Sequence, residues 1–233
     1  MKYTVHSEIF NLEPTIKFGI LIGKNIRNSP TSAEDEARLR QAELRMQELY
    51  KSEQVRELPM VAFYRDIMSR AGINPNKFPP SVEAMYKRIL KGGQLPTINA
   101  VVDLCNAVSI EQVISLGAHD LADINTDLDV RYSITGDKFL PFGSTEWEAV
   151  DAGEIIFTAG NEVQTRKWLW RQSELGKTAI DSNTLIFQLV GYGNDANAPL
   201  YQAMNDIKKL IVERFNGSYS EFIVDINNRI IHW

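Results

Sequence analysis

The sequence is poor in the residues that build the common metal and redox sites. It contains one cysteine, Cys105, and three histidines, His6, His119 and His232. A single cysteine excludes an intramolecular disulfide and fits a reducing compartment. The histidines lie far apart, and there is no H-E-x-x-H, G-x-G-x-x-G or P-loop motif. We therefore expect no bound metal and no nucleotide cofactor.

Long apolar runs and an excess of basic charge are also absent. No segment approaches the roughly 18 apolar residues of a membrane helix, and the start has no apolar run of signal-peptide length. We therefore expect a cytoplasmic chain with no membrane contact. The formal net charge of −5 argues against a general nucleic-acid coat protein, whose domain would be basic, but leaves room for a local basic patch. We expect no DNA partner, and tRNA as a possible one.

The order of the hydrophobic patterns predicts an α+β fold, because helical patterns precede a run of extended ones instead of alternating with them. We expect residues 1–57, strands followed by a charged helical region, to be integrated with the core of a larger unit, 58–233. Helices are expected over 34–57, 60–71, 81–90, 95–108 and 198–215, and strands over 16–22, 128–134, 155–158, 163–171, 184–190 and 219–226.

Three polar side chains on the helix expected over 95–108 are candidates for a pocket wall. Asn99, Asp103 and Asn106 are four and three residues apart, so they share a face beside the apolar stripe that ends at Cys105. An unpaired buried polar group costs about 1–3 kcal/mol, so these groups need partners. Either they join the helix to neighbouring backbone, or they line a pocket.

Two further segments carry candidate chemistry. The segment 115–121 reads as a loop in which Gly117 allows close approach beside His119, or as a turn that Asp120 caps. The segment 165–173 reads as a strand with tryptophans and arginines. Such side chains can stack on bases and bind phosphates, or form a sheet surface on which arginine stems cover the rings. Cys105 itself reads as a small core residue.

These segments, in this order, resemble the editing (B3/B4) domain of the bacterial phenylalanyl-tRNA synthetase β subunit, and most closely free-standing proteins that carry this domain alone. The resemblance covers roughly residues 60–215. It is carried by Pro-Thr-Ile-Asn-Ala-Val-Val-Asp-Leu-Cys-Asn at 96–106, Ala-His-Asp at 118–120 and Thr-Arg-Lys-Trp-Leu-Trp-Arg-Gln at 165–172. It implies sandwich-like sheets packed against helices, and hydrolysis of misacylated tRNA. In the synthetase, the domain removes tyrosine from phenylalanine tRNA.

The sequence departs from the family pattern at two positions. Gly117 stands where the synthetase has histidine, with His119 at a phenylalanine position. Gln188 aligns with the glutamate that recognises the phenol, and an amide is not an anionic acceptor. We expect His119 to orient water or act as a base near neutral pH, and we expect a substrate pocket and a tRNA contact. The expected pocket residues are Asn99, Asp103, Asn106, Gly117 and Gln188, and the expected tRNA contacts are Lys87, Arg88, Lys91, Arg166 and Arg171.

Two alternatives to an aminoacyl-tRNA deacylase remain open. One is a module that binds RNA or a small amino-acid-like ligand without chemistry, which the acidic charge and the altered positions favour. The other is a ligand sensor whose charged N-terminal helices bind a partner.

Overall fold

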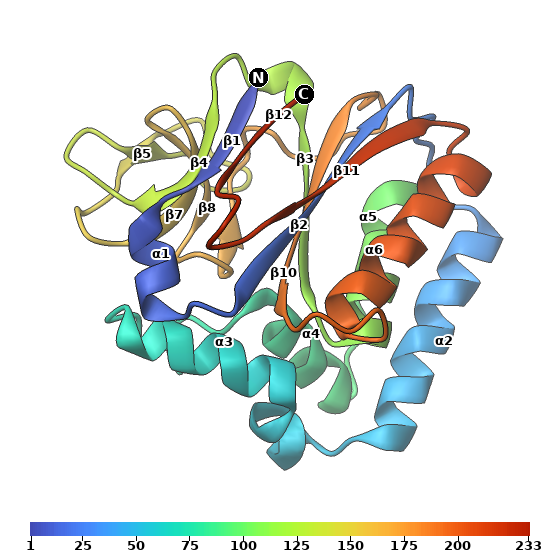
Figure 1. Cartoon of the computed structure of the whole chain (residues 1–233). Coiled ribbons are helices and arrows are strands. Elements are labelled where there is room, and N and C mark those ends of the chain that lie inside the picture. The colour runs from blue at the N-terminus through green and yellow to red at the C-terminus, as the bar shows by residue number, and fades with distance from the viewer.

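Two β-sheets with a shared hydrophobic core between them form the centre of the molecule (Figure 1). The computed structural model describes residues 1–233. The four-stranded sheet has the order β11-β2-β10-β3 and is antiparallel throughout. The larger sheet has the order β12-β1-β4-β7-β8-β5-β6, with β9 paired to β8. Within it, β1 and β4 are parallel, as are β5 and β8.

The strands are β1 (Lys2–Val5), β2 (Ile16–Lys24), β3 (Ser115–Asp120), β4 (Leu128–Tyr132), β5 (Lys138–Phe139), β6 (Glu148–Ala149), β7 (Ile155–Ala159), β8 (Glu162–Arg166), β9 (Arg171–Gln172), β10 (Leu185–Tyr192), β11 (Ser218–Val224) and β12 (Ile230–His232). The helices are α1 (Ser7–Leu12), α2 (Ala33–Leu49), α3 (Pro59–Arg70), α4 (Ser81–Leu90), α5 (Ala100–Gln112) and α6 (Pro199–Lys209). Two short 3₁₀ helices, η1 (Ser52–Glu57) and η2 (Leu121–Asp123), and a π-helix, η3 (Leu210–Arg214), complete the set. The α+β prediction is therefore confirmed.

Alternation along β10 divides its side chains between two cores. Leu185, Phe187 and Leu189 pack with α5 and α6 on the outer face of the four-stranded sheet. Ile186 and Val190 point the other way, into the core that both sheets share. Gln188 lies on that same inner face, since side chains two residues apart share a face. A polar side chain thus lies among apolar ones between the sheets.

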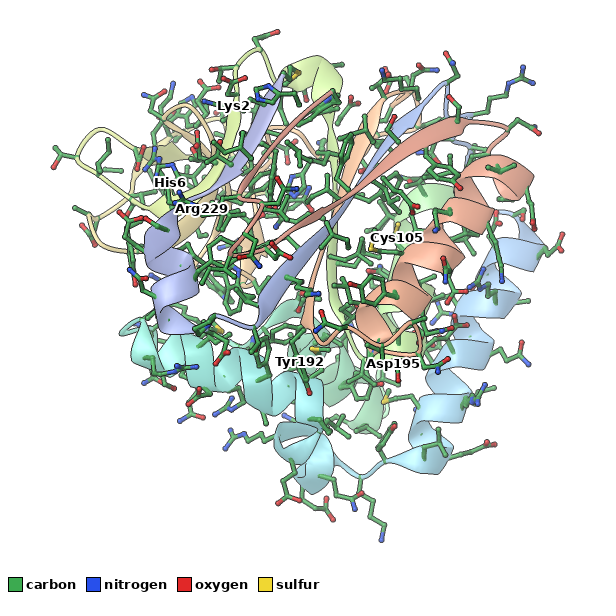
Figure 2. All side chains as sticks on the ribbon, viewed as in Figure 1. Lys2, His6, Cys105, Tyr192, Asp195 and Arg229 are labelled. Atoms are coloured by element: carbon green, nitrogen blue, oxygen red, sulfur yellow. The ribbon has the colours of Figure 1, made fainter.

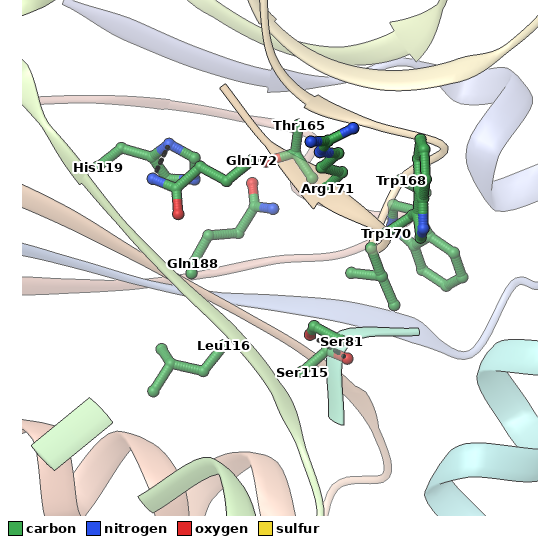
Figure 3. A pocket seen from close by; sticks show the side chains of 12 residues that line it. Ser81, Ser115, Leu116, His119, Thr165, Trp168, Trp170, Arg171, Gln172 and Gln188 are labelled. Carbon is green, nitrogen blue, oxygen red and sulfur yellow. Dashed lines mark hydrogen bonds between the residues drawn. The ribbon is translucent and has the colours of Figure 1, made fainter. Parts of the chain in front are cut away.

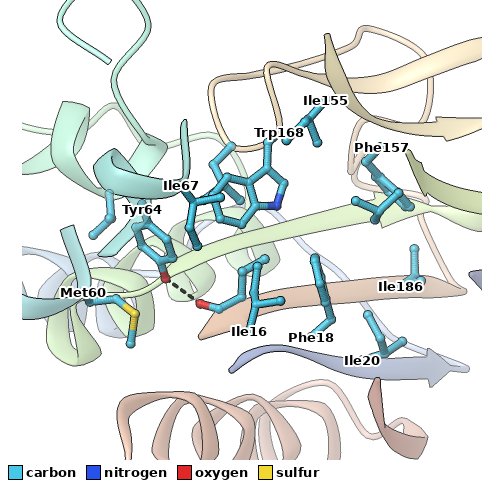
Figure 4. Close-up of a cluster of buried hydrophobic side chains, with 14 of the residues drawn as sticks. Ile16, Phe18, Ile20, Met60, Tyr64, Ile67, Ile155, Phe157, Trp168 and Ile186 are labelled. Atoms are coloured by element: carbon cyan, nitrogen blue, oxygen red, sulfur yellow. Dashed lines mark hydrogen bonds between the residues drawn. The ribbon is translucent and has the colours of Figure 1, made fainter. Parts of the chain in front are cut away.

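Helix α3 closes one end of the core between the sheets. Met60, Tyr64 and Ile67 pack there beside Phe18 of β2 and the indole of Trp168 (Figure 4). The Tyr64 hydroxyl donates to the Val190 carbonyl at 2.5 Å, which satisfies a hydroxyl that is fully buried. Trp168 meets the Tyr64 ring edge to face at 6.0 Å. The helix is therefore fixed to β10 at the level of the pocket described below.

Local sequence signals placed several elements correctly. Ser32 and Asp35 form the predicted start of α2 as a reciprocal capping box. Cys105 is buried beneath α6, as predicted for a core residue, and burial raises the pKa of its thiol to about 12 (Figure 2). None of the helices is long and apolar enough to cross a membrane.

Other predictions were wrong. The strands expected before the charged helical region are interrupted by α1, and β12 was missed. The helix expected over 95–108 begins at Ala100, so the apolar Ile98 lies outside it and is 57% exposed. The expected loop at 115–121 is mostly strand β3. The expected strand 163–171 ends at Arg166 and turns sharply.

Candidate functional site

A small pocket lies between the two sheets, where β3, β10 and the turn after β8 meet (Figure 3). Its cavity of about 80 Å³ has room for a few water molecules or one compact chemical group, but not for a nucleotide. His119, Gln172 and Gln188 lie at one side of it and Trp168 and Trp170 at the other. The residues that line it are Ser81, Ser115, Leu116, Gly117, His119, Thr165, Trp168, Leu169, Trp170, Arg171, Gln172 and Gln188.

His119 is buried, and its neighbours fix which ring nitrogen carries the proton. The Gln172 amide nitrogen donates to the Ala118 carbonyl at 2.9 Å and lies 3.2 Å from Nδ1 of His119. Because the first bond orients the amide, its NH₂ faces Nδ1, which must then be the acceptor. The proton is therefore on Nε2, which has no hydrogen-bond partner within the protein and lies on the side of Gly117.

Burial also sets the charge state of His119. Loss of solvation lowers its pKa to about 3, so the imidazole is neutral across the physiological range. This corrects the expectation of a base that titrates near neutral pH. Asp120 does not orient the ring either, because it points to the other face of β3, accepts from the Ala122 amide at 2.9 Å and contacts Ser182. The alternative in which Asp120 caps the chain locally was right.

Gln188 presents only hydrogen-bond donors to the pocket. Its Oε1 accepts from the Tyr3 hydroxyl at 2.7 Å, and no other acceptor bonds that hydroxyl. Burial raises the pKa of Tyr3 well above its ordinary value, so the phenol stays a donor. The amide oxygen is thereby committed to Tyr3, and the Nε2 group, which makes no bond within the protein, is left on the pocket side.

The turn after β8 is the part of the pocket that the sequence misrepresented most. Lys167 and Trp168 adopt left-handed backbone angles, with φ of +48° and +65°, so residues 165–172 do not alternate as one strand. Glu154 holds this turn: it accepts from Arg166 at 2.8 Å, and from the backbone amide and Nζ of Lys167 at 2.8 and 2.6 Å. Trp168 is consequently buried instead of lying on a sheet surface, and its Nε1 has no partner.

The charge lining the pocket is positive. Arg171 is exposed at its edge, makes no ion pair, and stacks over Trp170 with 5.9 Å between the guanidinium and the ring centre. No aspartate or glutamate lines the cavity. Together with the unused N–H groups of His119, Gln188 and Trp168, this makes a site that complements oxygen acceptors.

Asn99 and Asp103 lie away from this pocket, in the hydrogen-bond network that starts α5. Asn99 caps the helix by accepting from the Val102 amide at 3.1 Å and donates to the Thr178 carbonyl at 3.0 Å. Asp103 accepts from the Ile98 amide at 2.9 Å and from Thr31 at 2.5 Å. Asn106 does not line the cavity either. These contacts match the alternative in which the polar groups join the helix to neighbouring backbone.

Of the five cations proposed for tRNA, only Arg171 lines the pocket. Arg166 is paired with Glu154, and Lys87 with the buried Glu83 at 2.5 Å. Arg88 donates to the Gln94 carbonyl, and Lys91 is exposed beyond the far end of α4. Helix α4 meets the pocket through its first residue, Ser81. The opposite end of the helix, away from the pocket, carries Lys87, Arg88 and Lys91.

Of the residues predicted from the sequence, Gly117, His119, Arg171 and Gln188 line the pocket, whereas two residues that only the fold brings to the site were missed. Tyr3 comes from β1 of the other sheet, and Glu154 acts through the turn it holds. Neither has a local sequence signal. No group of three or more histidine, cysteine, aspartate or glutamate side chains has an arrangement that would hold a metal.

Comparison with known proteins gives a family. A family model described as the B3/4 domain matches residues 63–199, more than half of the chain. Among solved structures, an N-terminal fragment of the phenylalanyl-tRNA synthetase β-subunit from Pyrococcus horikoshii is similar, with 9% identity and a TM-score of 0.46. The alignment covers 95% of this chain and 53% of the fragment, so the chain spans about half of its length. No curated protein sequence matches.

Proposed function

The chain belongs to the B3/4 domain family, and from this we propose that it hydrolyses the ester bond of misacylated aminoacyl-tRNA, with the aminoacyl group in the pocket around His119. The observation that carries the proposal is a half-open pocket lined by unused N–H donors of His119, Gln188 and Trp168 and by no carboxylate. Such donors, held in place before the reaction, stabilise the negative charge that develops on an ester oxygen.

The proposed reaction needs no covalent intermediate. Water adds to the ester carbonyl carbon, the bond to the ribose oxygen breaks, and the products are a free amino acid and a tRNA with its terminal hydroxyl restored. Because an aminoacyl ester is already activated, holding water and carbonyl in register supplies much of the rate. His119 takes part as a donor through Nε2, and not as a base, because it is neutral with a pKa of about 3.

The rest of the tRNA must remain outside the cavity, which at about 80 Å³ is too small for a nucleotide. Arg171 at the edge is the cation available to a phosphate of the acceptor end, since it has no acidic partner. The charge of −5 on the whole chain makes such a local contact necessary.

One observation favours the binding module as a second candidate. The cavity lacks aspartate, glutamate and lysine, and its one imidazole has Nδ1 turned to Gln172. No lining side chain is therefore suited to take a proton from water near neutral pH. In this case the same donors would bind a ligand without cleaving it.

A deacylation assay against a panel of mischarged tRNAs tests the proposal. We expect release of at least one amino acid above the rate without protein, and its loss in Gln188→Met, while Arg88→Ala, a change far from the pocket, retains the rate. Binding of the panel without release would establish the binding module, and neither binding nor release would reject both functions.

A further inference from the structure

The contact between Tyr3 and Gln188 links a strand outside the matched family region to the pocket. Tyr3 lies on β1, whereas the family match begins at residue 63 and includes Gln188. Both side chains are at least nine-tenths buried, and the hydroxyl lies 2.7 Å from Oε1 of Gln188. Because Oε1 accepts this bond, the other end of the amide is the end offered to an occupant.

The lining offers acceptors only in the hydroxyls of Ser81, Ser115 and Thr165, which can also donate, and in the Gln172 amide oxygen; the nitrogen groups are donors. Nε2 of His119 carries a proton because Gln172 occupies Nδ1. Nε1 of Trp168 can only donate and has no partner. Nε2 of Gln188 can only donate while Tyr3 holds Oε1. Arg171 adds a positive charge at the edge, and no carboxylate balances it.

We propose that Tyr3 is a specificity-determining residue that holds Gln188 in the donor orientation, so that the pocket selects an aminoacyl group whose side chain ends in a carboxylate. This rests on the proposed function only in taking the pocket as the place of the aminoacyl group. A carboxylate offers several lone pairs to N–H donors and a charge that Arg171 complements. An ammonium can only donate, and no carboxylate lines the cavity to accept from it or to balance its charge.

The experiment uses four probes of similar size whose ends differ in chemistry: the N-acetyl, N-methylamide derivatives of aspartate, asparagine, leucine and 2,4-diaminobutyrate. Their dissociation constants are measured by calorimetry on the full chain. We expect the aspartate derivative to bind most tightly and the diaminobutyrate derivative least tightly, with asparagine between them. Since no ester is present, failure of hydrolysis leaves this result unaffected.

Two variants separate the role of Tyr3 from that of the charge. Tyr3→Phe frees the amide to turn, so the preference for aspartate over diaminobutyrate should fall by about tenfold, the weight of one hydrogen bond to a charged group. Gln188→Glu places a carboxylate oxygen on the pocket side and should reverse the preference. Tyr86→Phe is the matched control, since it removes another buried hydroxyl, bonded to the Ile110 carbonyl at 2.7 Å, and should leave the ranking unchanged.

Three outcomes would overturn the inference: a wild-type ranking led by leucine or diaminobutyrate, no binding of any probe, or an unchanged preference for aspartate over diaminobutyrate in Tyr3→Phe. If Tyr3→Phe does not fold, the reversal expected for Gln188→Glu decides, because it tests the donor orientation without altering Tyr3. If deacylation is absent while the ranking holds, the proposed hydrolysis fails and the selectivity stands.

Discussion

Replacing Glu154 with alanine should both unfold the turn after β8 and disassemble the pocket. The two left-handed residues, Lys167 and Trp168, cost about 1–3 kcal/mol each, and the bonds to Glu154 offset that cost. Removing the buried carboxylate strands the cations of Arg166 and Lys167, which in buried pairs costs about 3–5 kcal/mol. Arg166 keeps Glu148 at 3.6 Å, but that carboxylate is 57% exposed, so it compensates little. We expect a loss of about 3–4 kcal/mol of unfolding free energy.

Urea unfolding followed by tryptophan fluorescence measures this loss, with the m-value checking that both chains unfold alike. Glu162→Ala is the control: it removes an ion pair with Lys138 in which both side chains are 36% exposed, and should cost less than about 1 kcal/mol. The hydrogen bonds to Glu154 outweigh burial, which by itself raises its pKa, and hold that pKa below the ordinary value. The carboxylate's contribution is thus present above the ordinary glutamate pKa and lost as pH falls through the lower folded pKa. Equal losses in the two variants, or no acid-dependent difference between wild type and Glu154→Ala, would refute the reasoning.

Four further outcomes are expected. Asp103→Asn should cost about 1–3 kcal/mol in urea unfolding yet leave ligand affinity unchanged, because Asp103 anchors α5 and not the pocket; weakened binding would return it to the site. Gly117→Ala places a Cβ 3.2 Å from Nε2 of His119, so ligand affinity should fall while the thermal midpoint stays near that of wild type. The deacylation rate should show no inflection from His119 between about pH 5.5 and 8, because the imidazole is neutral above its pKa of about 3; a step that disappears in His119→Phe would contradict this. Arg171→Ala should weaken tRNA binding and reduce its salt dependence by about one phosphate contact, whereas Lys91→Ala should not.

The sequence predicted those elements whose signals are local. Ser32 and Asp35 mark the start of α2 because the two side chains bond each other's backbone across one turn. The apolar positions of α4 repeat at helical spacing because one side of that helix is buried. The α+β class followed from the order of such patterns, and the family resemblance from three segments inside the region that the family model matches.

Local sequence signals could not predict the pocket, because the side chains that line it are held by contacts between residues far apart in the chain. Neither Lys167 nor Trp168 is a glycine, so no residue in 165–172 indicates a left-handed turn. The side chain that stabilises the turn is Glu154, in the connection between β6 and β7. Tyr3 reads as an ordinary strand aromatic, and its bond to Gln188 spans 185 positions. The tryptophans therefore appeared to form a surface stripe, although Trp168 is buried.

The inward residues of β3 explain both why the sequence did not predict this strand and why a pocket forms beside it. Its inward positions are Ser115, Gly117 and His119, none of them a large aliphatic side chain, so the strand lacks the apolar alternation that identifies a half-buried strand. Between two packed sheets, small and polar side chains leave space that aliphatic ones would fill. The cavity and the missing pattern thus have one cause. The inward side chains of β3 are small or polar, so they leave space, whereas apolar side chains fill the rest of the interface between the sheets.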